Sequence, residues 1–159
     1  MVLDSVNALQ EQLSHNISVT VRESIDYNLL EEVETLSLSA IKKNSELKYL
    51  VFYNVDKELI SIYGISPKVT PALLLNENET MKKYNSDPNN DYLVEFHTRI
   101  DGNSGNVFYL IAAYDNQKYK FYIDEIKEEY IYYTLFIILV ILVIGYLFLN
   151  KILISPLNV

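Results

Sequence analysis

Cysteine is absent from the 159 residues of this chain, and histidine occurs only twice. Without cysteine the chain forms no disulfide and offers no thiolate as a nucleophile or metal ligand. The two histidines, His15 and His97, fall in different predicted elements, and no nucleophile stands beside a base in the sequence. We therefore expect no catalytic residue, no metal site, no cofactor and no enzymatic activity in this chain.

Basic residues are also scarce. Lysine and arginine together number 13, against 21 aspartates and glutamates, so the formal net charge is -8 and the pI is about 4.7. No run of basic residues occurs in the sequence. Because nucleic-acid binding depends on basic patches that neutralise phosphates, this composition argues against a nucleic-acid partner.

Glycine and proline number four each, and their distribution is uneven. Neither occurs between Asp115 and Gly145, so we expect one continuous helix there, with Asp115 as its N-cap. Three of the four prolines fall between residues 65 and 91, among clusters of Asn, Asp and Glu. This segment is predicted to be a loop, with a short helical turn in 71–77 or 78–84 as the alternative.

One long stretch carries no charge at all, the 20 residues from Tyr130 to Leu149. As a helix it would extend roughly 30 Å, the hydrocarbon thickness of a bilayer. It also lacks the polar stripe that a core helix of this length would show. We therefore predict a globular domain at 1–128, a transmembrane helix at 129–150 and the start of a linker at 151–159.

The charges that flank this helix are asymmetric. Carboxylates crowd its beginning, and Lys151 stands alone just past its end. The positive-inside rule places Lys151 in the cytoplasm and residues 1–128 outside it. The first ten residues, MVLDSVNALQ, lack the basic and apolar regions of a signal peptide. We therefore expect a further transmembrane helix upstream of Met1 as the export route.

Two helices are predicted in the first 45 residues. Apolar residues recur at steps of three or four, as on one face of an amphipathic helix of about 25 residues (Val2, Val6, Leu9, Leu13, Ile17, Val21 and Ile25). This narrow stripe predicts a homodimer through the helix, and packing of its second half on the chain's own sheet is the alternative. His15 lies among polar neighbours, where we expect it to be solvated. Asn28 and Glu31 form a predicted capping box for the second helix.

The remaining segments show the alternation of strands. Residues 47–64 predict a β-hairpin around a tight DKE turn, and residues 93–100 and 107–114 predict another around DGNSGN. The order helix, helix, hairpin, loop, hairpin, helix predicts an α+β fold. In it, a long N-terminal helix and a second helix pack on an antiparallel sheet, and a transmembrane helix follows.

This arrangement resembles the extracytoplasmic PAS-like sensor domain, of the single Cache type, found in bacterial transmembrane receptors. YLVFYNVDKELISIYG (49–64) is similar to its first hairpin, and GNVFYLIAAYDNQKYKFYIDEI (105–126) resembles its last strand and the juxtamembrane helix. KILISPLNV (151–159) resembles the start of a HAMP-like signalling linker. The ligand-binding motifs of amino-acid and dicarboxylate Cache sensors have no match in the sequence.

The resemblance implies a ligand-sensing input module in the bacterial inner membrane, with residues 1–128 on the periplasmic side. Such a module binds a small molecule or a periplasmic partner. It passes a conformational signal through its C-terminal helix to a histidine kinase, a diguanylate cyclase or a chemoreceptor domain. A membrane-anchored structural or assembly protein, whose α+β domain binds other proteins, is the alternative.

Candidate ligand-binding residues lie on the predicted strands. In VEFHTRI (94–100), alternation places Glu95, His97 and Arg99 on one face. They form either a solvated row or part of a pocket, in which Arg99 would bind a carboxylate through two hydrogen bonds. Tyr63 and Tyr109 either pack half-buried on the sheet or line a pocket between it and the 65–91 segment. The candidates are thus His97, Arg99, Tyr63 and Tyr109.

Overall fold

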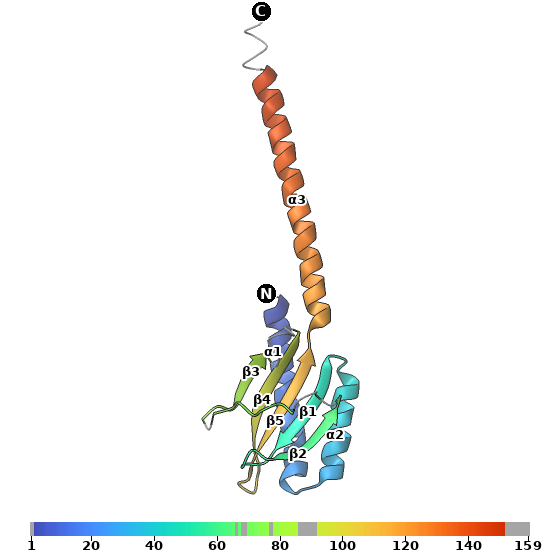
Figure 1. Cartoon of the computed structure of the whole chain (residues 1–159), viewed down its shortest axis with the longest axis vertical. Helices are drawn as coiled ribbons and strands as arrows, with labels where there is room; N and C mark the ends of the chain where they lie inside the picture. The colour runs from blue at the N-terminus through green and yellow to red at the C-terminus, as the bar shows by residue number, and fades with distance from the viewer. Residues whose placement is uncertain (1, 66, 68–69, 77, 86–91, 152–159) are drawn as a thin grey trace, which may run out of the picture. The chain divides into compact units, whose positions relative to one another are not determined.

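A computed structural model describes residues 2–65, 67, 70–76, 78–85 and 92–151. The chain divides into two compact units, 1–120 and 121–159. The first unit holds two helices and a five-stranded sheet, and the second holds most of a long third helix (Figure 1). The predicted linker at 151–159 lies outside the described residues, apart from Lys151.

The sheet is antiparallel throughout, with the strand order β2-β1-β5-β4-β3. Its strands are β1 (Leu47–Tyr53), β2 (Leu59–Gly64), β3 (Met81–Asn85), β4 (Leu93–Asp101) and β5 (Val107–Asp115). Both predicted hairpins are confirmed, because β1 pairs with β2 and β4 pairs with β5. With the two helices at its N-terminus, the domain has the predicted α+β fold.

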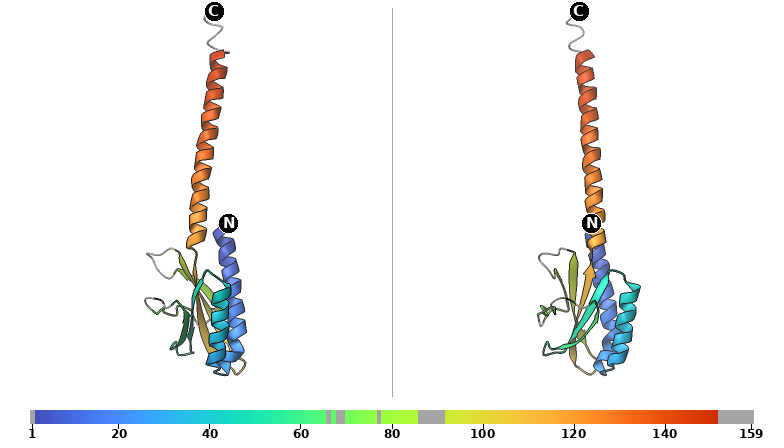
Figure 2. Two further views of the ribbon diagram at one scale, coloured as in Figure 1. Left: turned by 90° about the vertical axis from the view of Figure 1, so that its right-hand side faces the viewer. Right: turned by 45° about the vertical axis from the view of Figure 1, so that its right-hand side comes forward.

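Both helices cover one face of this sheet (Figure 2). They are α1 (Val2–Asp26) and α2 (Leu30–Lys43). Ile17, Val21 and Ile25 of α1 and Val33 of α2 are buried against strand residues, including Phe52 of β1. The alternative for α1, packing of its second half on its own sheet, is therefore confirmed.

The first half of α1 departs from the predicted stripe. Its buried residues there are Gln10 and Ser14, whereas Leu9 is 57 % exposed. The Ser14 hydroxyl lies 3.1 Å from the hydroxyl of Tyr114 on β5 and donates to the Gln10 carbonyl at 2.8 Å. The buried side of this half-helix is therefore polar, with Ser14 bonded to β5 and Gln10 to Asn116, a feature that apolar periodicity does not predict.

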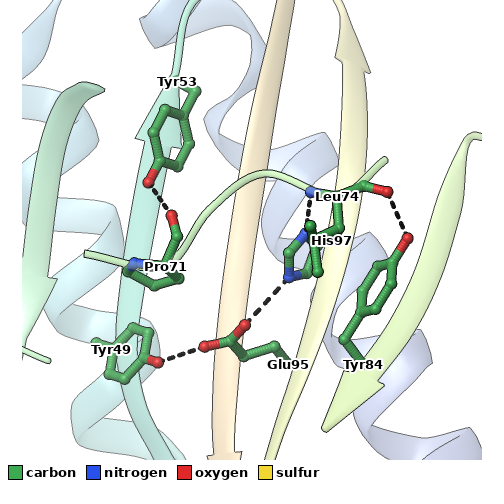
Figure 3. Close-up of polar contacts among 7 residues, drawn as sticks. All are labelled: Tyr49, Tyr53, Pro71, Leu74, Tyr84, Glu95 and His97. Atoms are coloured by element: carbon green, nitrogen blue, oxygen red, sulfur yellow. Dashed lines mark hydrogen bonds and ion pairs between the residues drawn. The ribbon is translucent and has the colours of Figure 1, made fainter. Parts of the chain in front are cut away.

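The opposite face of the sheet is also buried. A second apolar cluster forms there, in which Leu75 packs against the inner strands (with Tyr49, Val51, Tyr53, Tyr109, Ile111 and Ala113). Residues 70–76, here called the covering segment, supply that leucine and cross this face (Figure 3). The three inner strands therefore have side chains buried on both faces.

Two local predictions are wrong. Residues 81–85 form the edge strand β3, which pairs with β4, instead of a loop or helical turn. Met-Lys-Lys-Tyr-Asn has little β propensity of its own, so the strand depends on hydrogen bonds with β4. The capping box also fails: Leu29 is the N-cap of α2 without a side-chain hydrogen bond, and Asn28 has φ 57°. A residue in that left-handed conformation belongs to the turn that ends α1.

The third helix, α3 (Gln117–Leu149), confirms the predicted uninterrupted helix, with a small shift at its start. Asp115 is the last residue of β5, and the carbonyl of Asn116 accepts the first helical hydrogen bonds, from Tyr119 and Lys120. Asn116 therefore occupies the N-cap position, one residue after the predicted Asp115, whose carboxylate still caps the helix by accepting from the Gln117 N–H at 2.9 Å. Among the described residues, α3 is the one helix long and apolar enough to cross a membrane.

Candidate functional site

Glu95 and His97 lie on the sheet face that the covering segment crosses, one strand alternation apart on β4. The solvated interpretation is wrong for both, because Glu95 is 4 % exposed and His97 is 0 % exposed. Burial of two ionisable side chains in a domain core is costly unless their polar atoms are paired. Their partners therefore define the site.

A chain of hydrogen bonds links β1, β4 and the covering segment (Figure 3). The Tyr49 hydroxyl on β1 donates to Glu95 Oε1 at 2.6 Å. Glu95 Oε2 lies 3.2 Å from His97 Nε2, and the backbone N–H of Leu74 points at His97 Nδ1, at 3.3 Å. We call Tyr49, Glu95 and His97 the buried network.

These contacts fix the proton positions. His97 Nδ1 faces an amide N–H, so it acts as an acceptor and the ring proton sits on Nε2. Nε2–H then donates to Glu95, whose other oxygen accepts from Tyr49. Both oxygens of Glu95 are acceptors, which suits an ionised carboxylate beside a neutral imidazole. Burial raises the pKa of Tyr49, and its hydrogen bond to Glu95 raises that pKa further, so the phenol stays protonated.

The register of the sheet explains how β1 reaches β4 across the strand between them. Ala113 of β5 is the cross-strand partner of both Tyr49 and Glu95. Its methyl group leaves space above β5, and the phenol of Tyr49 extends over it to the carboxylate. A larger residue at 113 would occupy the path of this hydrogen bond.

Tyrosines also hold the covering segment in place. Tyr53 of β1 donates to the Pro71 carbonyl, and Tyr84 of β3 donates to the Leu74 carbonyl. The Tyr84 ring also packs on the His97 ring, with 4.5 Å between their centroids. Backbone N–H and C=O groups outside a strand ladder need other hydrogen-bond partners, and here side chains of the sheet serve as those partners.

The four predicted ligand-binding residues are only partly brought together. His97 and Tyr109 lie on the same buried face, and Tyr109 is the cross-strand partner of Arg99. Arg99 Nε donates to Asp101 Oδ1 at 2.8 Å, so this guanidinium has an acidic partner within the chain. Tyr63 lies on the helix-covered face, where its ring meets Phe52 edge-on at 5.9 Å.

Sequence reasoning missed Tyr49, Tyr84 and the role of Glu95. A signal for Glu95 was available, because it is the one carboxylate in the alternating run 93–100. If both faces of that strand are buried, such a carboxylate cannot reach water and needs hydrogen-bond partners inside the domain. Tyr84 could not be found because β3 itself was not predicted. Its hydroxyl meets the covering segment only when 81–85 is paired with β4.

Chemically, the site can hold the covering segment against the sheet through hydrogen bonds. Its polar groups are paired with one another, and no group of three or more potential metal ligands occurs among the described residues. Compared with protein-family models, with curated proteins and with solved structures, the chain matches none of them.

Proposed function

We propose that this chain is the ligand-sensing input module of a bacterial membrane receptor, with the α+β domain outside the cytoplasm. Acidic residues before the apolar part of α3 and Lys151 after it support this orientation in the inner membrane. A periplasmic small molecule or protein is the input. The signal leaves through α3 toward a cytoplasmic output domain of the kinase, cyclase or chemoreceptor type.

The observation that carries this proposal is the direct connection of β5 to α3. β5 is the central strand, hydrogen-bonded to both β1 and β4, and only Asn116 separates it from the helix of membrane-spanning length. A simple anchor has no need to begin at the middle of a core sheet. A change in the sheet, in contrast, must displace the first turn of α3.

Side chains fix this junction to the rest of the domain. Gln10 of α1 and Asn116 are both buried and exchange two hydrogen bonds, at 2.5 and 3.3 Å. Asn116 N–H donates to the Tyr92 carbonyl at 2.7 Å, and Lys118 forms an ion pair with Glu46. Movements of α1, of β4 or of the residues before β1 therefore reach the start of α3.

The covering segment is the element that a ligand would displace. It is fixed by hydrogen bonds from Tyr53 and Tyr84 and by the amide of Leu74 at His97, and not by a strand ladder. Each such bond contributes only about 1 kcal/mol. A ligand that prefers one arrangement of this segment shifts the population by its difference in affinity.

A homodimer through α1 belongs to the same proposal. Val2 and Leu9 of the predicted stripe are 48 % and 57 % exposed, and a second α1 would cover them. Leu9→Cys in this cysteine-free chain tests the contact, because a symmetric dimer would form a disulfide-linked pair at that position under mild oxidation. Val19→Cys, which is similarly exposed but not part of the predicted stripe, is the control.

The receptor function is tested with the whole chain placed between the first transmembrane helix and the output domain of a reporter histidine kinase. Tyr53→Phe and Tyr84→Phe each remove one hydrogen bond to the covering segment. We expect the basal kinase output to change by up to about fivefold, the population shift that about 1 kcal/mol produces. Tyr27→Phe, at a position 65 % exposed, is the matched control and should leave output unchanged.

Equal output from the parent and both variants, at equal amounts in the membrane, would contradict the sensing role. It would favour the alternative of an anchored assembly protein, in which the state of the covering segment has no consequence across the membrane.

A further inference from the structure

The covering segment contacts the sheet as a bound peptide would, through side chains that hold its main chain (Figure 3). Tyr53 donates to the Pro71 carbonyl. Tyr84 donates to the Leu74 carbonyl, and the N–H of the same leucine donates to His97 Nδ1 at 3.3 Å. Among the described residues, the segment belongs to no strand of the sheet. Its hydrogen bonds to the sheet are therefore ones that a separate peptide could also form.

Two neighbouring leucines show which features of the segment the sheet recognises. At Leu74 both main-chain groups are bonded to side chains of the sheet, whereas the residue is 52 % exposed. Leu75 is 3 % exposed and packs in the apolar cluster of the inner strands. A molecule that replaces the segment therefore needs a donor for His97, acceptors for the two tyrosines and an apolar group in the place of the Leu75 side chain.

The width of the site favours an extended chain over a compact molecule. β1, which carries Tyr53, and β3, which carries Tyr84, are separated by β5 and β4. Three strand spacings amount to roughly 14 Å. An extended peptide covers that distance with about four residues of roughly 3.3 Å each, as the covering segment does from Pro71 to Leu74. A compact molecule that met one tyrosine would leave the hydroxyl of the other without its partner.

We propose that this site binds an extended apolar peptide, an interior segment of another protein, in place of the covering segment. The inference rests on the proposed function and names the input of the receptor. The hydrogen bonds of the site go to main-chain amides and carbonyls, which every interior peptide presents. Both oxygens of Glu95 already accept hydrogen bonds, from Tyr49 and His97, so this carboxylate is not available to a charged amino terminus. Burial of an unpaired terminus is unfavourable, which favours an interior segment over a free end.

Binding is measured with a peptide that has the sequence of the covering segment. The probe is Pro-Ala-Leu-Leu-Leu-Asn, residues 71–76, labelled with a fluorophore and blocked at both ends. Its fluorescence anisotropy is recorded with the full chain in maltoside detergent, and micelles without protein are the blank. We expect saturable binding of this probe. A probe with Leu75→Asp should not bind, because its charge would enter the apolar cluster. Equal binding of the two probes would overturn the proposal.

Variants of the chain test whether its own segment occupies the peptide site. Leu75→Ala weakens the packing of the covering segment on the sheet, so the affinity of the chain for the peptide should rise by about tenfold or more. Leu74→Ala changes an exposed side chain of the same segment and should bind the peptide as the parent does. No saturable binding to the Leu75→Ala chain, or the same affinity as for the parent, would overturn the proposal.

Loss of single main-chain contacts assigns the binding to this site. In the Leu75→Ala chain, Tyr84→Phe removes the donor to the peptide carbonyl, and a probe N-methylated at the Leu74 position lacks the N–H for His97. Each change should weaken binding about fivefold, the effect typical of one hydrogen bond. Tyr27→Phe in the same chain, at a position 65 % exposed, is the control. Unchanged affinity after both changes would mean that the peptide binds elsewhere, and would refute the site.

Two further comparisons separate the source of the peptide and the fate of the receptor proposal. A probe with free termini should bind more weakly than the blocked probe; equal or tighter binding would overturn the interior segment in favour of a free oligopeptide. The blocked probe should also change the output of the reporter kinase, and binding without such a change would contradict the receptor proposal alone. No binding, alongside a changed output of the Tyr84→Phe reporter, would overturn the peptide ligand and leave the receptor proposal intact.

Discussion

At the scale of single residues, the buried carboxylate of Glu95 depends most clearly on its hydrogen-bond partners. Its carboxylate is 4 % exposed and depends on two donors, Tyr49 and His97. A buried charge that loses a donor retains its desolvation cost without the compensating bond. The stability of the domain should therefore respond more strongly to these donors than to other tyrosines of the sheet.

Tyr49→Phe tests this directly. The variant keeps the ring and removes only the hydroxyl that donates to Glu95 at 2.6 Å. We expect the free energy of unfolding to fall by about 2 kcal/mol, within the range for a hydrogen bond to a charged group. The measurement is denaturant unfolding of the full chain in detergent. Tyr63→Phe, which keeps its ring contact with Phe52 on the other face, is the control and should change stability less.

Asp26 provides a second test at this scale. Its carboxylate joins the end of α1 to the turn after β4, with Ser104 N–H at 2.9 Å and Asn106 Nδ2 at 3.2 Å. The hydrogen bonds from Ser104, and then the one from Asn106, hold the pKa of Asp26 below its ordinary value. A folded-state pKa below that of the unfolded chain contributes stability above the unfolded value, about pH 4, and this contribution disappears as pH falls through the lower folded value.

Asp26→Asn should therefore flatten the pH dependence of the melting temperature below about pH 4, while the parent loses stability there. A variant with an unchanged slope would contradict the assignment. Gly102→Ala disturbs the same contact by another route, since a Cβ at that position would collide with the Asp26 carboxylate. It should lower the melting temperature at neutral pH and reduce the slope in acid.

At the scale of elements, the covering segment and β3 form one unit. Tyr84 of β3 donates to the Leu74 carbonyl and packs on His97, whose Nδ1 accepts from the Leu74 amide. Within the described part of the chain, the segment is also held by Leu73 and Leu75 in the apolar layer, by the Tyr53 bond to Pro71 and by hydrogen bonds between Asn76 and Glu79. Local opening of such a unit costs less than global unfolding.

Tyr84→Phe tests whether the covering segment opens locally, without global unfolding of the domain. We expect the Leu74 amide to exchange its hydrogen about fivefold faster, the effect of losing about 1 kcal/mol from the local opening equilibrium. Amides of β1 and β5 should exchange at parental rates. Hydrogen exchange followed by mass spectrometry resolves the two regions. Uniform acceleration over the whole domain would show that the covering segment does not open on its own.

The same elements show how far sequence alone reaches. The two hairpins and α3 were predictable because alternation, turn residues and a long uncharged run are local signals. β3 was not predictable, because residues 81–85 have little β propensity and form a strand only through hydrogen bonds with β4. His97 was placed on the correct face, but the sequence left open whether it is solvated or lies in a pocket, and the structure excludes only the solvated alternative. Its burial depends on the covering segment, which is distant in sequence from β4.

The turn of the first hairpin shows a related limit. Lys57 has φ 63°, a left-handed conformation in which glycine is the usual residue. A lysine is accommodated there because its neighbours close the turn: Asn54 and Glu58 exchange backbone and side-chain hydrogen bonds, three of them at 2.8 to 3.0 Å. The residue type at position 57 therefore does not determine the turn conformation, because the flanking side chains stabilise it.

At the scale of the whole molecule, the absence of cysteine becomes an experimental advantage. Any introduced thiol is unique in the chain, so its accessibility reports on one position. Two exposed lysines lie on opposite sides of the predicted span, Lys43 at the end of α2 and Lys151 just after α3. The proposed orientation places the first outside the cytoplasm and the second inside it.

In intact cells that express the chain behind the first transmembrane helix of the reporter histidine kinase, a membrane-impermeant maleimide should label Lys43→Cys. Lys151→Cys should react only after the membrane is permeabilised. The expectation rests on the carboxylates before the apolar run of α3 and the lysine after it, which the cytoplasmic side retains because translocating a positive charge is unfavourable. Labelling of Lys151→Cys but not Lys43→Cys in intact cells would reverse the orientation. It would place the buried network and the covering segment in the cytoplasm, where they could not report on the cell exterior.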